Sequence, residues 1–414
     1  MSVARRLVVV GASLAGLRAV EAARGDGFDG EIVLIGDEVH LPYDRPPLSK
    51  AFLDGAESAA FRTVEHLVDD LHVDVRLGSA ATSLDLASRT VSMGSDAVEY
   101  DGLVIATGAR ARTLPSVGAL GNVHGLRSVD DAASVRSALD AGARTVVIGA
   151  GFIGAEIASN ARSRGLEVTI VEALPTPLVR AVGPVMGEAL GRLHDANGVQ
   201  LICGTGVESF IGTDTVEGVV LMDGRRLDAD LVVVGVGSQP NIEWLEQSGL
   251  NLQNGVKCDA TLWTGAPGVY AAGDVANWYN AATGTRQRLE HWTSAAEQGA
   301  AAGRNACNPQ LSLPYSTVPY FWSDWYGNRI QFVGSPVCDD VVAVEGTPGE
   351  DQRWVALYRR HDTVVGALTV NAQSEIMKYR GLIGRAASWT EATAFADQRN
   401  AARRDRLSAS SAVE

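Results

Sequence analysis

The 414-residue chain is poor in cysteine, and its few cysteines are far apart. They are Cys203, Cys258, Cys307 and Cys338, and no two of them lie within three residues of each other. Zinc sites and iron–sulfur clusters use closely spaced cysteines, so neither is expected, and we expect no metal site. The thiols are interpreted as reduced and mostly structural, as in a cytosolic protein.

Net positive charge and long apolar runs are also absent from the sequence. The 49 acidic residues outnumber the 35 lysines and arginines, which gives a formal net charge of −14. Because nucleic-acid binding needs a positive surface, this charge argues against a nucleic-acid partner. No apolar run approaches membrane-spanning length, and the start MSVARRLVVVG has no small-residue cleavage site. We therefore expect a cytoplasmic protein without a membrane partner.

Glycine, by contrast, is abundant, and the 45 glycines include two turns of the G-x-G-x-x-G type. These turns are VVVGASLAG at 8–16, with serine at its second glycine position, and VVIGAGFIG at 146–154. Each turn follows a Val- and Ile-rich strand and precedes an expected helix, as in a βαβ unit of a parallel sheet. The strand–helix–strand patterns are predicted at 7–10, 14–23 and 31–35, and at 145–148, 153–164 and 167–171.

Both turns have an acidic residue at the end of the next strand. Asp37 lies 21 residues after Gly16, and Glu172 lies 18 residues after Gly154. A spacing of about 20 residues places a carboxylate beside the ribose of a bound dinucleotide. Ser13 replaces the second glycine of the first turn, but serine is small and its hydroxyl can donate to a phosphate. The alternative, that the turns only let a helix pack closely on a strand, is less favoured because the whole pattern occurs twice.

Two dinucleotide sites in one chain indicate electron transfer between them, and a nicotinamide and a flavin form a natural pair. The second turn is assigned to NADH, because Glu172 would repel the 2′-phosphate of NADPH and no arginine follows before Arg180. The first turn is then assigned to FAD. The residues expected to bind at the NADH site are Gly149, Gly151, Phe152, Ile153, Gly154, Glu156, Glu172 and Gly237.

The rest of the sequence predicts that one βα unit is inserted between parts of the other, and that a separate α+β module ends the chain. Further strands are expected at 103–109, 207–211, 216–222, 231–237 and 269–276. The proline-rich stretch PYDRPPLSK at 42–50 is predicted to form no regular element. Near the C-terminus we expect an antiparallel pair at 353–360 and 363–370, a helix at 374–387 and a disordered tail at 408–414.

Several of these stretches match a known family. The chain resembles the FAD-dependent pyridine nucleotide-disulfide reductase superfamily, and within it the putidaredoxin reductase-like ferredoxin reductases of bacterial cytochrome P450 and aromatic-ring dioxygenase systems. The matching stretches are VVVGASLAG, LIGDEVHLPYDRPPLSK, LVIATGA, VVIGAGFIGAEIA, VYAAGDVA, LEHW and PYFWSDWYGNRIQFVG. PYDRPPLSK and FWSDW are the specific ones, whereas the glycine turns alone indicate only the superfamily.

The resemblance implies an α/β fold of the glutathione-reductase-like type. It comprises two Rossmann-like dinucleotide-binding domains and a C-terminal α+β interface domain. The expected FAD domain consists of residues 1–110 and 243–318, the inserted NAD domain of 111–242, and the interface domain of 319–414.

The resemblance also implies which residues line FAD. They are Ala15, Asp37, Lys50, Ala81, Arg127, Asp274 and Trp292. The first glycine turn adds Gly11, Ser13, Leu14 and Gly16, and the later turns add Thr107, Gly108 and Gly273. Trp322 is a further candidate, because a flavin ring needs flat apolar neighbours. Asp274 is expected to bond the ribityl or pyrophosphate portion, although an aspartate in such a turn can also be a simple cap. Arg45 is an alternative ligand for the phosphates, and Trp325 is interpreted as ordinary core packing.

Lys50 and Glu156 are the candidate catalytic residues. The resemblance implies that they pair near the nicotinamide, where they would hold its ring and offset charge on the reduced flavin. A buried ion pair is costly unless it is well hydrogen-bonded, so such a pair would indicate function rather than stability. The alternative is that Lys50 is a solvated loop residue and Glu156 a residue on a helix surface.

The cysteine positions also bear on the electron acceptor. Disulfide reductases of this superfamily place a reactive cysteine beside the flavin, either in a CxxC pair or as a single cysteine in the N-terminal part. The first cysteine here, Cys203, follows both glycine turns, and no CxxC pair occurs. We therefore expect NADH to reduce FAD, followed by single-electron transfer to a [2Fe–2S] ferredoxin that serves a cytochrome P450 or a dioxygenase. A rubredoxin reductase, an NADH oxidase and an apoptosis-inducing-factor-like redox sensor remain as alternatives. Basic residues that could steer an acidic ferredoxin are Arg304, Arg329, Lys378, Arg380 and Arg385.

Overall fold

The structure is a computed structural model that describes residues 5–118 and 120–411. The chain forms two compact units, each assembled from three segments. The first unit contains Met1–Pro47, Glu57–Arg110 and Ser238–Thr317, and the second contains Leu48–Ala56, Ala111–Gly237 and Val318–Glu414. The short segment Leu48–Ala56, which we expected in the FAD domain, thus lies in the same unit as the second glycine turn.

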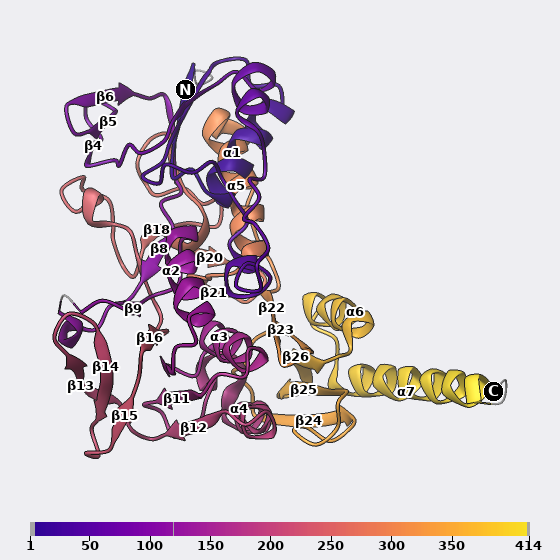
Figure 1. The fold of residues 1–414 in the computed structure, drawn as a ribbon. Helices are drawn as coiled ribbons and strands as arrows, with labels where there is room; N and C mark the ends of the chain where they lie inside the picture. Colours follow the sequence, from indigo (N-terminus) through magenta and orange to yellow (C-terminus); the bar gives the residue numbers. More distant parts are fainter. Residues whose placement is uncertain (1–4, 119, 412–414) are drawn as a thin grey trace. The chain divides into compact units, whose positions relative to one another are not determined.

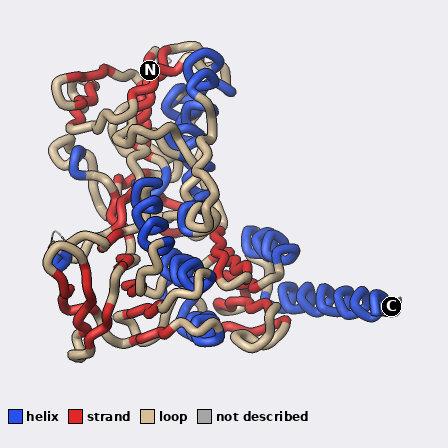
Figure 2. The backbone as a smooth tube through the Cα atoms, viewed as in Figure 1, coloured by secondary structure: helices blue, strands red, loops and turns tan. Residues whose placement is uncertain are grey.

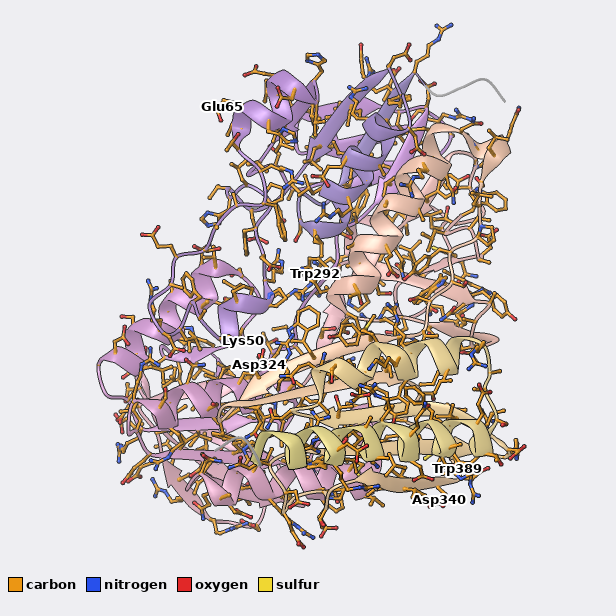
Figure 3. All side chains as sticks on the ribbon, turned by 90° about the vertical axis from the view of Figure 1, so that its right-hand side faces the viewer. Lys50, Glu65, Trp292, Asp324, Asp340 and Trp389 are labelled. Atoms are coloured by element: carbon orange, nitrogen blue, oxygen red, sulfur yellow. The ribbon has the colours of Figure 1, made fainter. Side chains whose placement is uncertain are left out.

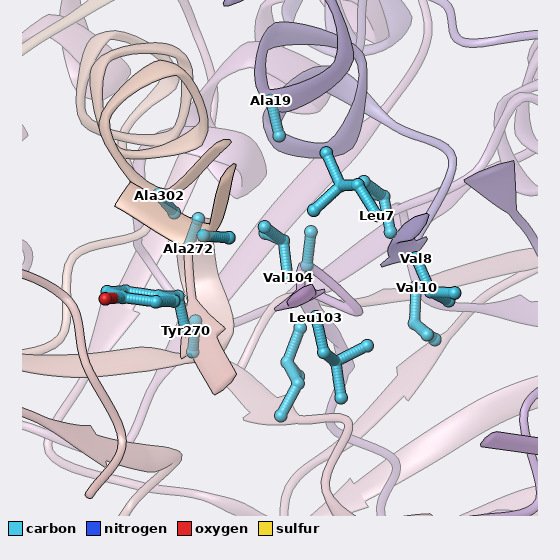
Figure 4. Close-up of a cluster of buried hydrophobic side chains, with 14 of the residues drawn as sticks. Leu7, Val8, Val10, Ala19, Leu103, Val104, Tyr270, Ala272 and Ala302 are labelled. Carbon is cyan, nitrogen blue, oxygen red and sulfur yellow. The ribbon is translucent and has the colours of Figure 1, made fainter. Parts of the chain in front are cut away.

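The first unit combines an early part of the chain, indigo in Figure 1, with a later, orange part. A parallel five-stranded sheet, in the order β19-β7-β1-β2-β3, forms its centre. Its strands are β1 (Arg6–Val10), β2 (Glu31–Ile35), β3 (Val73–Arg76), β7 (Gly102–Ile105) and β19 (Val269–Ala271). Val10 pairs with both Ile35 and Ile105, so three strands end together at the first glycine turn. The strand residues are mostly apolar and buried, and they form the core cluster shown in Figure 4.

Two helices of this unit, α1 (Leu14–Gly25) and α5 (Trp292–Cys307), pack closely against each other. A Cβ atom at Gly299 would lie 2.2 Å from the carbonyl oxygen of Ala15, and one at Gly303 would lie 2.3 Å from that of Ala19. Glycine at these positions therefore allows the two backbones to touch. Ala19 of α1 and Ala302 of α5 both belong to the buried cluster of Figure 4.

Smaller elements complete the first unit. Antiparallel β4 (Ser83–Asp85), β5 (Thr90–Met93) and β6 (Asp96–Glu99) form one sheet, and β18 (Val256–Cys258), β20 (Ala276–Asn280) and β21 (Thr285–Gln287) form another. The short helices are η2 (His66–Asp70), η4 (Glu243–Leu245), η5 (Gly273–Val275) and η6 (Pro309–Leu311). The strand predicted at 269–276 is therefore interrupted by η5, where Gly273 has a φ of 76°. Where the chain passes between the units it contains β8 (Ala109–Ala111) and β17 (Ser238–Pro240).

The second unit contains another parallel five-stranded sheet, in the order β12-β11-β10-β16-β9. Its strands are β9 (Val123–His124), β10 (Thr145–Ile148), β11 (Val168–Glu172), β12 (Gln200–Cys203) and β16 (Leu231–Val234). Ile148 pairs with Val171 and Val234, which brings three strand ends to the second glycine turn. The accompanying elements are η3 (Pro115–Val117), α2 (Val129–Asp140), α3 (Phe152–Ser163), α4 (Val179–Ala196), β13 (Val207–Gly212), β14 (Val216–Leu221) and β15 (Arg226–Asp228).

The C-terminal part of the second unit is an antiparallel five-stranded sheet followed by two helices (Figure 2). The strand order is β22-β23-β26-β25-β24. The elements are β22 (Tyr320–Trp325), β23 (Asn328–Gly334), β24 (Asp340–Glu345), β25 (Trp354–Arg360), β26 (Thr363–Val370), α6 (Gln373–Gly384) and α7 (Trp389–Ser411). The predicted antiparallel pair is confirmed, because Arg360 pairs with Thr363 across the hairpin.

Two local predictions were wrong. The proline-rich stretch at 42–50 contains a short 3-10 helix, η1 (Pro46–Ser49), because proline is tolerated in the first turn of a helix. The tail at 408–414 was expected to be disordered, but α7 continues through Ser411, and 412–414 lie outside the described residues. Hydrogen bonds to a distant residue hold this helix in place, because Nε and Nη2 of Arg399 each donate to an oxygen of the Glu375 carboxylate at 2.8 Å.

No helix in the described part of the chain combines the length and the apolar character that a membrane crossing requires.

Candidate functional site: two glycine turns and a buried ion pair

The first glycine turn joins β1 to α1 in the first unit. A Cβ at Gly11 would lie 2.1 Å from the carbonyl oxygen of Ala106, and one at Gly16 would lie 1.9 Å from that of Gly11. Packing alone therefore requires both glycines. Ser13 is the N-cap residue of α1, yet its side chain makes no capping hydrogen bond. The first amides of α1 thus lack a side-chain cap and can bind an anion.

A polar network lies beside this turn. Arg45 donates from Nε to Ser13 Oγ at 3.2 Å and from Nη2 to Glu38 Oε1 at 2.5 Å. Tyr43 donates its hydroxyl to Glu38 Oε2 at 2.6 Å. Burial acts to lower the pKa of Arg45, but Tyr43, Glu38 and Asp274 outweigh it and raise the pKa overall. The network therefore connects the serine of the turn to the PYDRPPLSK stretch.

Glu38 is a residue of this network that the sequence analysis missed. The spacing rule pointed to Asp37, whose side chain is exposed and accepts the Glu38 amide at 3.0 Å. Glu38 immediately follows Asp37, so the spacing rule alone could not decide between two adjacent carboxylates. The pairing with Arg45 distinguishes Glu38, and this pairing depends on the fold of a loop.

The other candidates for FAD in the first unit lie in loops and at the start of α5. Asp274 is buried, with 7% exposed, in η5, and the amide of the preceding Gly273 donates to Gln298 Oε1 at 2.9 Å. Trp292 donates from Nε1 to Asp44 Oδ1 at 2.8 Å, which ties α5 to the PYDRPPLSK stretch. Ala81 is partly buried against the core of the unit.

Thr107 and Gly108 follow β7 in the loop where Gly108 has a φ of 64°. Thr107 donates its hydroxyl to the carbonyl of Asn241 at 2.8 Å, and Asn241 Nδ2 donates to the carbonyl of Thr107 at 2.9 Å. The Thr107 hydroxyl is therefore already used in a hydrogen bond within the protein.

The second glycine turn joins β10 to α3 in the second unit. A Cβ at Gly149 would lie 2.4 Å from the carbonyl oxygen of Gly235, and one at Gly154 would lie 2.4 Å from that of Gly149. A Cβ at Gly151, by contrast, would meet no atom within 4 Å, and the φ of Gly151 is −84°. Neither packing nor backbone conformation requires this glycine, and its open side leaves room for the close approach of a pyrophosphate.

Glu172 ends β11 and reaches back to this turn. Its Oε2 accepts the Ala150 amide at 2.8 Å, and its Oε1 accepts the Leu174 amide at 2.9 Å. The carboxylate is thereby fixed between the turn and the loop after β11, where a ribose hydroxyl would be expected. Gly237, after β16, has a φ of 102° and open space at its Cβ position.

The first two residues of α3 differ in their surroundings. Phe152 packs against Phe321 with ring centroids 4.9 Å apart, so it belongs to an aromatic cluster of the second unit. Ile153 is an exposed apolar residue at the N-terminus of α3, next to the open position at Gly151. An exposed isoleucine beside a nucleotide turn is available for contact with a ligand.

Lys50 and Glu156 form an ion pair within the second unit. Lys50 Nζ lies 2.8 Å from Glu156 Oε2, and the side chains are 20% and 3% exposed, respectively. Glu156 also accepts hydrogen bonds from the hydroxyls of Ser49 and Ser323. Lys50 and Asp324, whose amide also donates to Glu156, lie close together in Figure 3. The sequence analysis named the pair, but it did not identify either serine.

Arg127 lies in the second unit, just before α2. Its backbone amide donates to Asp131 Oδ2 at 3.0 Å, and Ser128 and Asp131 form a capping box at the helix start.

The two tryptophans of the FWSDW stretch differ in their surroundings. The Trp322 ring on β22 stacks on that of Tyr320, with centroids 5.8 Å apart, and its centroid lies 5.3 Å from the Arg329 guanidinium. Trp325 is 1% exposed, which confirms its interpretation as core packing.

The basic residues proposed to steer a ferredoxin are mostly paired within the chain. Arg304 belongs to the first unit and pairs with Asp26. The pairs in the second unit are Arg329–Asp324, Lys378–Glu375 and Arg385–Glu391. Arg380 donates from Nε to the carbonyl of Val318. These residues therefore do not form a patch of uncompensated positive charge.

The four cysteines are free in the structure. Burial raises the pKa of every one of their thiols, to about 12 for Cys307. A thiol with a raised pKa is a poor nucleophile at neutral pH. Within the described residues there is also no cluster of three or more His, Cys, Asp and Glu side chains that could hold a metal ion.

The surroundings of the His194 ring lead us to expect that the stability of the second unit depends on pH. It stacks on Trp325 at 5.0 Å, and its Nδ1 lies 2.8 Å from the Tyr326 hydroxyl. Burial lowers the pKa of His194 from 6.5 to about 4. The unfolded chain therefore takes up a proton first as the pH falls. We expect the free energy of unfolding to fall by about 2 kcal/mol between pH 7 and pH 5, measured by urea titration.

Two variants separate this effect from general acid sensitivity. His194→Asn should flatten the pH dependence between pH 7 and pH 5. The control, His72→Asn, changes an exposed histidine whose φ of 48° asparagine tolerates, and it should leave the pH dependence unchanged. If the free energy of unfolding fell equally between pH 7 and pH 5 in the unmodified protein and in His194→Asn, this expectation would be contradicted.

Comparison with known proteins places these features in context. Residues 5–299 match the family described as pyridine nucleotide-disulphide oxidoreductase, and residues 320–404 match the family described as reductase C-terminal. Rhodocoxin reductase of Rhodococcus erythropolis is 38% identical over 347 residues, which cover 82% of this chain and 81% of that protein. The biphenyl dioxygenase system ferredoxin–NAD(+) reductase component of Paraburkholderia xenovorans (strain LB400) is 36% identical over 381 residues, covering 91% and 93%.

Solved structures show the same similarity. The ferredoxin reductase for the CYP199A2 system from Rhodopseudomonas palustris is 34% identical, with a TM-score of 0.88, and the match covers 93% of this chain and 95% of that chain. A chain of the covalent putidaredoxin reductase–putidaredoxin complex is 31% identical, with a TM-score of 0.87, and the match covers 92% and 93%. The similarity thus extends over both units rather than over one nucleotide-binding domain.

Proposed function

Because the chain belongs to the pyridine nucleotide-disulphide oxidoreductase family, we propose that it is an NADH-dependent, FAD-containing reductase of a [2Fe–2S] ferredoxin. The observation that carries this proposal is the presence of two dinucleotide turns in one chain together with a C-terminal reductase domain. The relatives named as reductase components match more than four fifths of the chain, which supports the same activity. The proposed place of action is the cytoplasm, where NADH is available.

The first glycine turn fits the pyrophosphate of FAD. α1 starts without a side-chain cap, so its first amides can donate to phosphate oxygens. Arg45 donates to Ser13 Oγ, which leaves the Ser13 hydroxyl proton free to point toward a phosphate. Asp37 or Glu38 would bind the ribose, and the buried Asp274 would bind the ribityl chain or pyrophosphate.

The second glycine turn fits NADH. α3 also starts without a side-chain cap, and the open side of Gly151 leaves room for a pyrophosphate. Glu172, fixed by two backbone amides, would accept the ribose hydroxyls and disfavour a 2′-phosphate. This argument supports NADH over NADPH.

FAD, when bound, accepts a hydride from NADH and releases its electrons singly. In the reaction proposed, Lys50 supplies a positive charge where negative charge develops, and Glu156 holds Lys50 in place. No side chain needs to act as a general acid or base in the hydride step. The chain's main contributions are to orient two rings and to supply charge.

An outside acceptor is proposed because the chain's own thiols are unsuitable. All four cysteines have raised pKa values, so none is poised to act as a redox thiolate beside a flavin. The relatives include components named for dioxygenase systems, and a structural neighbour is a complex with putidaredoxin. We propose a ferredoxin of a cytochrome P450 or dioxygenase system as the partner of this chain.

The function is tested by NADH-driven reduction of cytochrome c with and without added ferredoxins and rubredoxins. We expect a [2Fe–2S] ferredoxin to raise the rate about tenfold or more over that of the protein alone. A larger increase with rubredoxin would identify a rubredoxin reductase. Rapid oxygen uptake without any carrier would indicate an NADH oxidase, and slow reduction by NADH with a long-lived complex would indicate a redox sensor.

The assignment of the two turns is tested by Glu172→Ala. We expect this variant to weaken NADH binding about tenfold, because the ribose loses a charged acceptor. Bound FAD should remain, as judged by the yellow colour after purification. Loss of the colour with unchanged NADH affinity would mean that the two sites are exchanged.

A further inference from the structure

Glu156 is held by other groups besides Lys50. Its Oε2 accepts the Ser49 hydroxyl as well as Lys50 Nζ, and its Oε1 accepts the Ser323 hydroxyl and, at 3.4 Å, the Asp324 amide. Ser49 and Ser323 are both buried. Each oxygen of this carboxylate therefore has one hydroxyl donor, and the two hydroxyls come from segments far apart in the sequence.

The chemistry of the carboxylate determines the direction of these bonds. A carboxylate paired with a lysine has no proton to give and acts only as an acceptor. Both serines must therefore donate, and hydrogen bonds to a charged acceptor are stronger than neutral ones. Two hydroxyls on opposite oxygens fix the plane of the carboxylate, whose terminal torsion is otherwise broad.

Other contacts hold both serines in place. The carbonyl of Ser49 accepts Asn160 Nδ2 at 3.0 Å, and Asn160 lies one helical turn after Glu156 on α3. Ser323 lies within β22, where it pairs with Ile330 of β23. Ser49 and Ser323 are thus positioned independently of the bonds that they make to Glu156.

The flexible side chain of Lys50 does not by itself fix the position of the ammonium group. Its side chain is long and flexible, 20% exposed, and an ammonium has no preferred donor direction like that of a guanidinium. Because the Glu156 carboxylate cannot rotate, its bond to Lys50 Nζ has a fixed direction. The serines therefore fix the carboxylate with which the Lys50 ammonium pairs.

We propose that Ser49 and Ser323 are positioning residues for the hydride transfer. They hold the Glu156 carboxylate, and this carboxylate holds the Lys50 ammonium. This inference rests on the proposed function, since it assigns the serines to that reaction.

The variants Ser49→Ala and Ser323→Ala test the inference, with Ser159→Ala as the matched control. Ser159 also links α3 to β22, but it does not bond to Glu156. In stopped-flow mixing with NADH, we expect each of the first two variants to slow flavin reduction about tenfold, with little change in the dissociation constant of NADH. The control should slow it less than twofold.

A double-mutant cycle shows whether the serines act through Glu156. In a Glu156→Ala background, removing either hydroxyl should change the reduction rate by less than about twofold, because no carboxylate remains to be held. A second readout is the midpoint potential of the bound flavin. It should become more negative in Ser49→Ala and Ser323→Ala, since a displaced Lys50 stabilises negative charge less, and it should not shift in Ser159→Ala.

The outcomes separate this inference from the proposed function. If the unmodified protein binds no FAD, or FAD is not reduced by NADH, the proposed function is wrong. If it is reduced normally, but both serine variants match Ser159→Ala in rate and midpoint potential, the positioning role is wrong. Equal tenfold losses with and without Glu156 would also overturn the role, because the serines would then act by another route. Should one serine variant fail to fold, the other decides the question, as each hydroxyl serves a different carboxylate oxygen.

Discussion

Gly151→Val is expected to weaken NADH binding about 100-fold, or about 2.7 kcal/mol, while the fold stays intact. A Cβ atom at this position meets no protein atom within 4 Å, and its backbone has an ordinary φ of −84°. Attaching a side chain here therefore causes no strain at its Cβ atom or in the backbone. It would instead occupy the space through which a pyrophosphate approaches the amides of α3. Calorimetric titration with NADH measures the affinity, and thermal unfolding measures the stability.

Gly381→Ala is a suitable control for this experiment. Gly381 lies in α6 of the same unit, and its Cβ position is also open. The control should leave NADH affinity unchanged and stabilise the protein slightly, because alanine favours a helix more than glycine does. Gly154→Ala should behave differently from both, since its Cβ would lie 2.4 Å from a backbone oxygen and disturb the turn itself. Normal NADH binding by Gly151→Val would remove the main structural support for a nucleotide at this turn.

Lys50→Met is expected to slow the reduction of flavin by NADH about 100-fold. The substitution keeps much of the length and apolar stem of lysine but removes the charge. It also leaves the Glu156 carboxylate, only 3% exposed, without its cation. An unpaired buried carboxylate is unfavourable, so the remaining donors would have to compensate for it. The rate is measured by the loss of flavin absorbance after rapid mixing with NADH.

Glu156→Gln and Lys378→Met complete this comparison. Glu156→Gln retains the Lys50 charge and should slow reduction less than Lys50→Met does. Lys378 also pairs with a glutamate in the second unit, with its nitrogen 3.6 Å from Glu375. Lys378→Met should leave flavin reduction unchanged. A Lys50→Met protein that is reduced as fast as Lys378→Met would exclude a catalytic role for the pair.

Much of the fold could be predicted from local patterns. The alternation of Val- and Ile-rich runs with helix-length segments predicted the strands at 7–10, 31–35 and 145–148, and the structure has strands there. Glycine turns after such strands are also local signals, because their chemistry depends on a few adjacent residues. The tail failed as a prediction because its helix is anchored by distant carboxylates, including Glu375.

Only part of the candidate site could be predicted from local sequence patterns. Lys50 and Glu156 were paired by resemblance, although they are 106 residues apart in sequence and no local pattern connects them. Glu38 was missed because spacing cannot choose between adjacent acids. Ser49 and Ser323 were missed because a serine carries no signal until the fold places it against a carboxylate.

The sequence by itself determined that this chain has two nucleotide turns, each with a strand before it and a carboxylate after it. Those features depend on hydrophobic periodicity and turn chemistry, which act over short stretches of chain. Only the tertiary structure decided which charges are neutralised, as in Arg329–Asp324, and which side chains surround Glu156. The reason is physical: hydrogen bonds and ion pairs act over a few ångströms, so their partners are known only once distant segments have been packed together.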